Sequence, residues 1–508
     1  MKILNLTKAE VIKQTKKLSF KICLIILLVL AIGIPILFKV FNQEEQSTIY
    51  TKEDLKAYQD NLIEKPSKEE DKLTNDLNKV MIDIINKYLN QDNKQKPTEF
   101  RTNLYDDYSR EKMNLVLISY MLNSKIQKYD AVEEEYNLDI LDKNNLREED
   151  LLELQKEKQK IIKSLENQIK ENDYTKYLKQ EIEVLKQDKT NKNNNYIIKV
   201  YQKLINLNIK DENDFRIEEA KNIVNYYNQK ETPMSKVEYS KQTSKIKYEK
   251  YIKITKDKNN ELDKQIKKSW YAINHNINYN KQGARTSLNE IVSNNVAFLS
   301  LIVVIISGSI VASEFQKGTI RLLVIRPNKR WKILLSKFLT IVLLTIGLSL
   351  ITYLASFITN GILYNFKDYF IKDLIINKNI VKETSYIFLS IGKMFMLLIP
   401  VIFSGLIAFF LSTITRNTAL SVGLSIFLQL GYGIVTMILV LISFPYLNLT
   451  FLPYLDYSQF INPLTLTDNY YLYESYYTLK TANIVLLIWG AILYGISNIV
   501  FTKKDIKN

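Results

Sequence analysis

The chain contains very little cysteine and histidine. Its 508 residues include one cysteine, Cys23, and one histidine, His275. A disulfide needs two cysteines, and transition-metal sites usually combine several Cys and His ligands. Disulfide-stapled folds and Cys/His metal centres are therefore excluded, and we expect this chain to bind no metal.

Glycine and proline are scarce over the long segment 42–293. This segment holds one glycine, Gly283, and the prolines Pro66, Pro97 and Pro233. It is rich in Lys, Glu, Gln, Asn, Leu, Ile and Tyr, a composition that favours helix over sheet. We therefore predict an all-α protein in which residues 42–293 form a separate helical domain.

The spacing of apolar residues predicts where these helices lie. From Leu146 to Lys189 apolar residues recur mostly three, four or seven positions apart, which predicts one long amphipathic helix. Similar spacing predicts helices over 55–89, 112–128 and 235–270. The heptads are imperfect, so the pattern favours a compact bundle over a coiled-coil rod.

Long apolar runs occur outside this segment. A hydrocarbon core about 30 Å thick requires about 20 apolar residues in a helix. Six blocks meet that requirement, and we predict a transmembrane helix over each of residues 22–41, 294–313, 338–360, 387–412, 419–444 and 482–502. The segments that remain are 1–21, 42–293, 314–337, 361–386, 445–481 and 503–508.

The first apolar block follows a basic leader and therefore also resembles a secretory signal. No small-residue cleavage site follows Pro35, and the block is long enough to span a membrane. We interpret it as an uncleaved anchor.

Lysine and arginine in the short segments predict the orientation. They are concentrated in the leader 1–21, the link 314–337 and the tail 503–508, and Arg416 lies in the tight turn between the fourth and fifth spans. With six spans all of these segments fall on one side, and basic flanks resist translocation. We predict a multi-pass protein of a bacterial plasma membrane with both termini cytoplasmic, segments 42–293 and 445–481 extracellular, and 361–386 as an outer loop.

The formal charge of +15 comes from those short segments. Segment 42–293 holds about 45 basic and about 45 acidic residues and is nearly neutral. The basic excess suits anionic lipid headgroups, so membrane lipid is an expected partner and nucleic acid is not. The lysine-rich stretch 236–268 is either a solvated helix face or a surface that binds anionic lipid or an envelope polymer.

Motifs of catalysis are missing from the sequence. It contains no G-x-x-x-x-G-K-[ST] loop, no nucleophile elbow and no H-E-x-x-H, and no acidic residue lies inside a predicted span. We therefore expect no enzymatic activity and no bound cofactor in this chain.

The link between the second and third spans carries the most informative pattern. It runs S-E-F-Q-K-G-T-I-R-L-L from Ser313 to Leu323 and continues through Pro327 and Arg330 to a lysine before the next span. Gly318 and Pro327 interrupt it, and Thr319 can cap a short helix. A short rigid element of this kind suits a membrane domain that takes force from a separate motor.

This pattern resembles the signature of the ABC-2 permeases, the membrane subunits of type 2 ATP-binding cassette exporters. The passage L-I-A-F-F-L-S-T-I-T-R-N-T-A-L-S-V-G-L-S-I-F and the tail F-T-K-K-D-I are similar to the same family. The resemblance covers the first span and everything after about residue 294, but not the large outer domain.

The resemblance implies a coupling helix that docks on an ATPase subunit. The residues that it assigns to this region are Glu314, Phe315, Gly318, Thr319, Arg321, Pro327 and Arg330. The leader would be an interfacial connecting helix that also touches the ATPase. The assembly implied has two ATPase copies, which carry ATP and Mg²⁺, and a second permease that is either this chain or a homologue.

The resemblance also implies an outer gate within 445–481. Its residues would be Pro445, Pro453, Tyr454, Tyr457 and Pro463. Prolines break helices and aromatic residues suit a membrane interface, which fits a re-entrant segment. An ordinary aromatic outer loop is the alternative.

The sequence therefore favours the permease subunit of an exporter, with a peptide or antimicrobial as the expected substrate. Efflux of sodium or drugs and export of lipid or polymer remain open. A membrane-anchored envelope scaffold or sensor, whose helical domain binds a partner, is the alternative of a different class.

Overall fold

The computed structural model divides the chain into two compact units. One unit comprises Met1–Val40 and Asn225–Asn508, and the other comprises Phe41–Val224. Because their mutual placement is not determined, each is described by itself. The residues that the structure describes are 2–44, 52–66, 68–91, 99–123, 148–187, 193–241, 247–281, 283–320, 329–442, 444, 446–461 and 478–503.

The first unit contains six helices that are long and apolar enough to cross a membrane. Their length and composition indicate a multi-pass membrane protein, as the sequence predicts. They are α2 (Leu18–Glu44), α13 (Ala284–Ile310), α16 (Arg330–Asn360), α17 (Tyr386–Thr415), α18 (Thr418–Leu441) and α21 (Leu479–Lys503).

Helices α13 and α17 form the centre of this bundle. They pack closely because Gly405 on α17 leaves room for α13, and a Cβ atom there would lie 2.8 Å from Val303. Gly308 on α13 likewise leaves room for α18, since a Cβ atom there would lie 3.0 Å from Val422. Small residues commonly permit such close approach between membrane helices. Most of α18 remains exposed along its apolar face.

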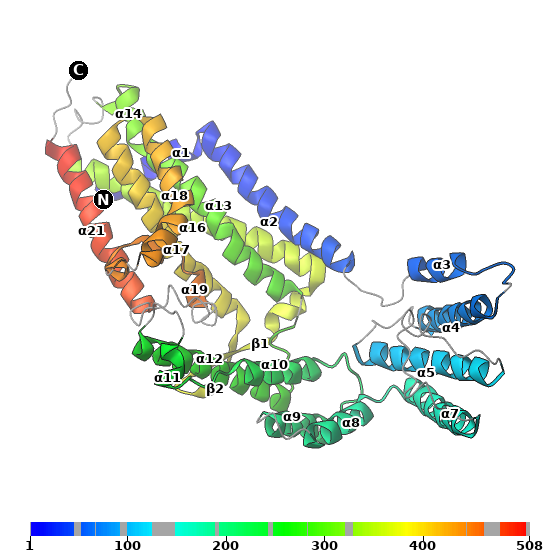
Figure 1. The fold of residues 1–508 in the computed structure, drawn as a ribbon. Coiled ribbons are helices and arrows are strands. Elements are labelled where there is room, and N and C mark those ends of the chain that lie inside the picture. The colour runs from blue at the N-terminus through cyan, green and yellow to red at the C-terminus, as the bar shows by residue number, and fades with distance from the viewer. Residues whose placement is uncertain are drawn as a thin grey trace. The chain divides into compact units, whose positions relative to one another are not determined.

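The start of α1 (Lys2–Thr15) and the end of α21 lie at one end of this bundle, which we call the terminal end (Figure 1). Helix α1 packs against α16 there, and the Thr340 hydroxyl donates to the carbonyl of Thr7 at 3.4 Å. The short helix α14 (Ala312–Gln316) lies at the same end.

A β-hairpin lies at the opposite end, which we call the hairpin end. After α16 the chain forms η1 (Gly361–Asn365) and η2 (Phe366–Phe370), then the antiparallel strands β1 (Lys372–Asn377) and β2 (Ile380–Ser385). Lys378 and Asn379 form a two-residue turn and both have positive φ, 47° and 66°, as a type I′ turn requires. The all-α expectation therefore needs this correction within the predicted outer loop 361–386.

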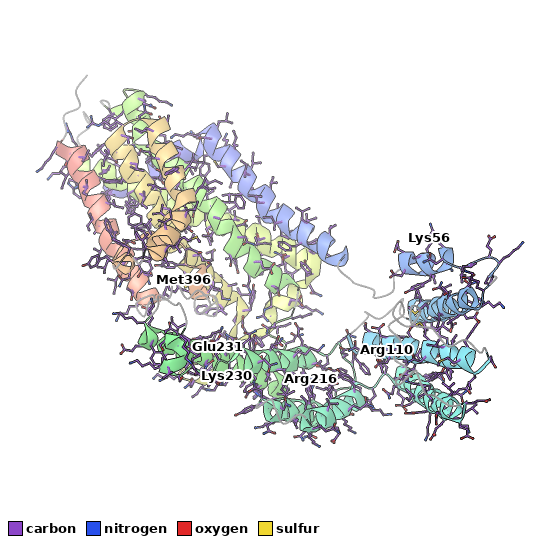
Figure 2. The ribbon with its side chains drawn as sticks, in the orientation of Figure 1. Lys56, Arg110, Arg216, Lys230, Glu231 and Met396 are labelled. Atoms are coloured by element: carbon purple, nitrogen blue, oxygen red, sulfur yellow. The ribbon has the colours of Figure 1, made fainter. Side chains whose placement is uncertain are left out.

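Helices α11 (Lys236–Ser240) and α12 (Tyr248–His275) lie near this hairpin, and α12 contacts both strands. The segment before α11 is fastened to α12 by ion pairs. Lys230 lies 2.8 Å from Asp263, and Lys258 lies 3.1 Å from Glu231 (Figure 2). Hydrogen bonds between Glu231 and Asn259 complete this attachment.

Every regular element among the described residues of the second unit is a helix, in agreement with the composition of the segment. Its helices are α3 (Lys52–Asp60), α4 (Glu69–Gln91), α5 (Glu99–Asn123), α7 (Glu148–Glu171), α8 (Tyr174–Gln187), α9 (Asn194–Asn206) and most of α10 (Phe215–Gln229). Helices α4, α5 and α7 share an apolar core that includes Leu73, Leu77, Leu117 and Leu151.

The single long helix predicted from Leu146 to Lys189 is wrong. The structure breaks it into α7 and α8 at Asn172, whose φ is 45°. The Asp173 carboxylate then accepts hydrogen bonds from the backbone N–H and the hydroxyl of Thr175, at 3.0 and 2.6 Å, and so begins α8. The apolar spacing continues across the break, so spacing alone did not reveal this local cap.

Candidate functional site

Four charged side chains, three of them buried and Lys13 half-exposed, meet at the terminal end and form an ion-pair network. Lys337 of α16 is at the centre, with its Nζ 2.8 Å from Glu314 Oε1 and 3.2 Å from Glu10 Oε1. Lys13 also pairs with Glu314. The network thus joins α1, α14 and α16, which are far apart in the sequence.

Burial makes this network energetically important. The side chains of Lys337 and Glu314 are 1% and 3% exposed. Burial by itself raises the pKa of Glu10, but the charges of Lys337 and Lys13 and a hydrogen bond from Gln14 outweigh it, so this pKa lies below its ordinary value. Two carboxylates balance two ammonium groups, which offsets the large cost of burying an isolated charge.

Helix α1 turns a polar face towards the bundle. Thr7, Glu10 and Gln14 are buried, whereas Leu4 is 70% and Ile12 is 45% exposed. This arrangement is the reverse of the usual one for a helix at a protein surface. The outward face carries Leu4 and Ile12 together with Lys8, a mixture of apolar and basic residues that suits a helix on a membrane surface.

The chain bends between α13 and α14, just before Glu314. One hydroxyl oxygen stabilises this bend, because Ser412 Oγ accepts hydrogen bonds from the N–H groups of Val311 and Ala312 at 3.2 and 2.9 Å. Gly318 then adopts a φ of 68°, in the region that favours glycine. The bend and the glycine turn leave residues 316–318 exposed at the tip of the link.

Aromatic and cationic contacts fix the base of this tip. The guanidinium of Arg416 lies 4.5 Å from the centroid of the Phe315 ring, and this ring contacts Phe501 edge-on. Arg330 Nη1 donates to the carbonyl of Thr502 at 3.2 Å. The link, the turn after α17 and the end of α21 therefore form one cluster, called the tip cluster below.

The structure brings several of the predicted coupling residues together. Phe315 and Arg330 belong to the tip cluster, Gly318 is exposed, and the Thr319 hydroxyl donates to the Glu314 carbonyl at 3.4 Å. The Glu314 side chain is buried and paired, so a direct contact with a partner requires the neighbouring residues 316–318 instead. Arg321 and Pro327 lie outside the described residues.

Three of the five predicted gate residues belong to the described part of the chain. Pro453, Tyr454 and Tyr457 are all buried. The Tyr454 hydroxyl donates to the Asn448 carbonyl at 3.0 Å, and the Tyr457 hydroxyl donates to Asn483 Oδ1 at 2.8 Å. These bonds make 446–461 a packed segment against α21. Pro445 and Pro463 lie outside the described residues.

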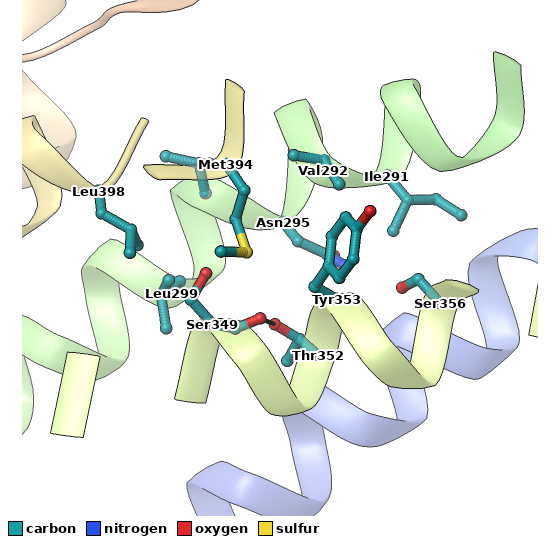
Figure 3. A pocket seen from close by; sticks show the side chains of 11 residues that line it. Ile291, Val292, Asn295, Leu299, Ser349, Thr352, Tyr353, Ser356, Met394 and Leu398 are labelled. Atoms are coloured by element: carbon teal, nitrogen blue, oxygen red, sulfur yellow. Dashed lines mark hydrogen bonds between the residues drawn. The ribbon is translucent and has the colours of Figure 1, made fainter. Parts of the chain in front are cut away.

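A small polar pocket lies among α13, α16 and α17 (Figure 3). Its volume is about 20 Å³, enough for one water-sized molecule. Asn295 is buried, with only 7% of its surface exposed, and its Oδ1 accepts no hydrogen bond from the described residues. Nearby, the hydroxyls of Tyr353 and Ser390 lie 2.7 Å apart. The pocket supplies polar groups inside an otherwise apolar bundle.

Sequence reasoning identified Glu314 but not its partners. Lys337 appeared as one of several basic residues flanking a span, and Glu10 as a lone acid in a basic leader. A signal was present, since Glu10 and Glu314 are the acidic residues of the leader 1–21 and the link 314–337. Within the described residues no group of three or more His, Cys, Asp and Glu side chains could hold a metal ion.

Comparison with known proteins finds a matching family model and a similar bacterial protein. Residues 259–507 match the family model described as "Protein of unknown function (DUF2705)". The chain is also similar to "Uncharacterized protein YhcI" of Bacillus subtilis (strain 168), with 27% identity over 246 residues, which are 47% of this chain and 74% of the relative. Neither the description of the family nor the name of the Bacillus protein states an activity.

Proposed function

We propose that this chain is the permease subunit of an ATP-binding cassette exporter and that its terminal end is the docking surface for the ATPase. The observation that carries the proposal is the tip cluster. Residues 316–318 are exposed at the end of α14, and Phe315, Arg416 and Phe501 join this tip to three spans. Through these contacts, movement of the tip is transmitted to α17, α18 and α21.

The buried network gives the same end a second connection. Glu314 links the tip to α16 through Lys337 and to α1 through Lys13. In this proposal α1 lies on the inner membrane surface, both termini are cytoplasmic, and the hairpin end and residues 42–293 are outside. The chain has no nucleotide-binding loop, so ATP and Mg²⁺ bind two copies of a separate ATPase subunit.

The substrate class that we propose is a peptide or antimicrobial, moved outward between two permeases. The large helical unit before α13 offers a surface for such a ligand. A membrane-anchored scaffold or sensor is the competing function, and it requires neither a motor nor a projecting tip.

Charge reversal at the tip tests this proposal. Lys317 is exposed, so Lys317→Glu should leave the fold unchanged but place a repulsive or unpaired charge in the docking surface. We expect at least about a tenfold loss of ATPase subunit copurifying with the tagged chain. ATP-driven uptake of the substrate into inverted membrane vesicles should also fall in this variant.

Lys382→Glu is the matched control, because Lys382 is an exposed lysine on β2 at the hairpin end. It should retain the ATPase at the level of the unmodified chain. Purification of the intact chain from its native membrane without any stoichiometric ATPase would instead support the scaffold or sensor.

A further inference from the structure

The hairpin end holds an excess of positive charge between α12, β1, α13 and α17. Ion pairs join Lys281 to Asp368 at 2.7 Å, Arg285 to Asp373 at 3.0 Å, and Lys372 to Glu383. These three pairs occupy the carboxylates of Asp368, Asp373 and Glu383. Two further lysines, Lys268 and Lys393, lie in the same region, near Asp373.

Arg285 is buried with part of its guanidinium unpaired. Its side chain is 3% exposed, and only Nη2 reaches a carboxylate. The face of the group lies over the Tyr386 ring, 4.4 Å from the centroid. The N–H donors at Nε and Nη1 point along the guanidinium plane, and no described residue accepts from them. Such orphaned donors are costly when buried, which indicates that an acceptor belongs there.

Lys268 of α12 and Lys393 of α17 lie within electrostatic reach of Asp373 and of each other. Neither makes an ion pair with a described carboxylate. Burial lowers the pKa of Lys268, and the charge of Asp373 only partly compensates. Asp373, already paired with Arg285, therefore faces two additional cations, and Glu261, the other carboxylate that acts on Lys268, is paired with Lys264.

We propose that Lys268, Arg285 and Lys393 form a binding site for a phosphate group. Guanidinium N–H donors and ammonium groups together match the several oxygens of a phosphate, and its negative charge balances the two surplus lysines. The group comes either from a phospholipid headgroup or from a free phosphate-bearing solute.

The position in the bundle suits both sources. Lys393 is seven residues after Tyr386, the first residue of α17, so it lies about 10 Å along the helix from that end. The site is therefore close to the end of the spans, where lipid headgroups and dissolved anions are both available.

Two lysine substitutions test the site while leaving buried Arg285 intact. Lys268→Gln and Lys393→Gln, combined in one variant, remove charge but keep chain length. Lys267→Gln is the control, because Lys267 is the exposed neighbour on α12. Full-length protein in detergent is titrated with sodium phosphate against sodium chloride of equal ionic strength, with the unfolding temperature as readout. Native mass spectrometry measures retention of phosphatidylglycerol against phosphatidylcholine.

We expect phosphate, phosphatidylglycerol or both to bind the unmodified chain and the Lys267→Gln control. The double variant should bind at least about tenfold more weakly. Binding of the lipid alone assigns the source to the membrane, and binding of inorganic phosphate alone assigns it to a solute. Without added anion the double variant should unfold at the same temperature as the unmodified chain or higher, because repulsion between cations is removed.

Two results would overturn the site. One is failure of both anions to bind the unmodified chain above their chloride and phosphatidylcholine controls. The other is equal binding by the double variant and the control. An unfolding temperature of the anion-free double variant well below that of the unmodified chain would also contradict it, because the lysines would then stabilise the fold by themselves.

Discussion

At the scale of single residues, the buried lysine of the terminal end has the largest expected energetic effect. Lys337 is 1% exposed. Ion pairs with Glu10 and Glu314 and a hydrogen bond to the Ile310 carbonyl offset the cost of burying its charge. Its removal leaves Glu314 buried with Lys13 alone. Loss of one partner from a buried pair commonly costs about 3 to 5 kcal/mol.

Lys337→Met should therefore lower the free energy of unfolding by about 3 kcal/mol. Denaturant unfolding of the purified protein in detergent measures it. Lys332→Met is the control on the same helix, since Lys332 is half-buried beside Trp331 and makes no ion pair with a described residue, and it should change stability by less than about 1 kcal/mol. Equal losses of unfolding free energy in the two variants would contradict the stabilising role that we assign to the network.

The same residues show what sequence could and could not predict about the site. The spacing around Gly318 indicated a turn, and the turn is present with its positive φ. The pairing of Glu314 with Lys337 could not be predicted, because it depends on how α14 bends against α16. Side chains 23 residues apart meet only after the helices have packed.

At the scale of helices, a glycine allows the two central spans, α13 and α17, to pack closely. Gly405 of α17 faces Val303, Ile341 and the Ser307 hydroxyl, and a Cβ atom would lie 2.8, 3.2 and 3.3 Å from them. Overpacking in a dense interior typically costs about 1 to 3 kcal/mol.

Gly405→Ala should therefore destabilise the bundle by about 1 to 3 kcal/mol, and thermal unfolding in detergent measures the change. Gly392→Ala lies on the same helix, but no atom lies within 4 Å of its Cβ position. It should be neutral or slightly stabilising, because alanine favours helix. A neutral Gly405→Ala would show that α13 and α17 separate easily at this crossing.

Local backbone chemistry explains the elements that sequence analysis missed. The hairpin depends on Lys378 and Asn379, which both adopt left-handed conformations that short strands need for a tight turn. The break between α7 and α8 depends on Asn172 in the same conformation. Asparagine tolerates this region, but many asparagines of this chain lie in helices, so the residue type alone did not mark these turns.

At the scale of the whole molecule, the six spans were predictable because apolar length is a property of the sequence itself. Four of the six predicted blocks fall within the observed helices. Block 294–313 extends past the end of α13 at Ile310, and block 419–444 extends past the end of α18 at Leu441. In the proposed arrangement all six helices cross the membrane, which places the two termini on one side and the hairpin on the other.

Site-specific labelling tests this arrangement in intact cells. The chain has a single cysteine, so Cys23→Ser provides a background without thiols. Lys8→Cys and Lys503→Cys should react with a membrane-impermeant maleimide only after permeabilisation, and Lys382→Cys should react before it. Labelling of all three positions from the same side would exclude six crossings between the terminal and hairpin ends.

The ion-pair network also constrains the order of events during synthesis. Glu10 and Lys13 leave the ribosome about 300 residues before Glu314 and Lys337, with the whole second unit made in between. Until α16 has been inserted, Glu10 has no Lys337 to compensate its burial, so helix α1 has little reason to dock. Closure of the terminal end is therefore a late step of assembly, and a ribosome that stops before residue 337 leaves the leader helix detached.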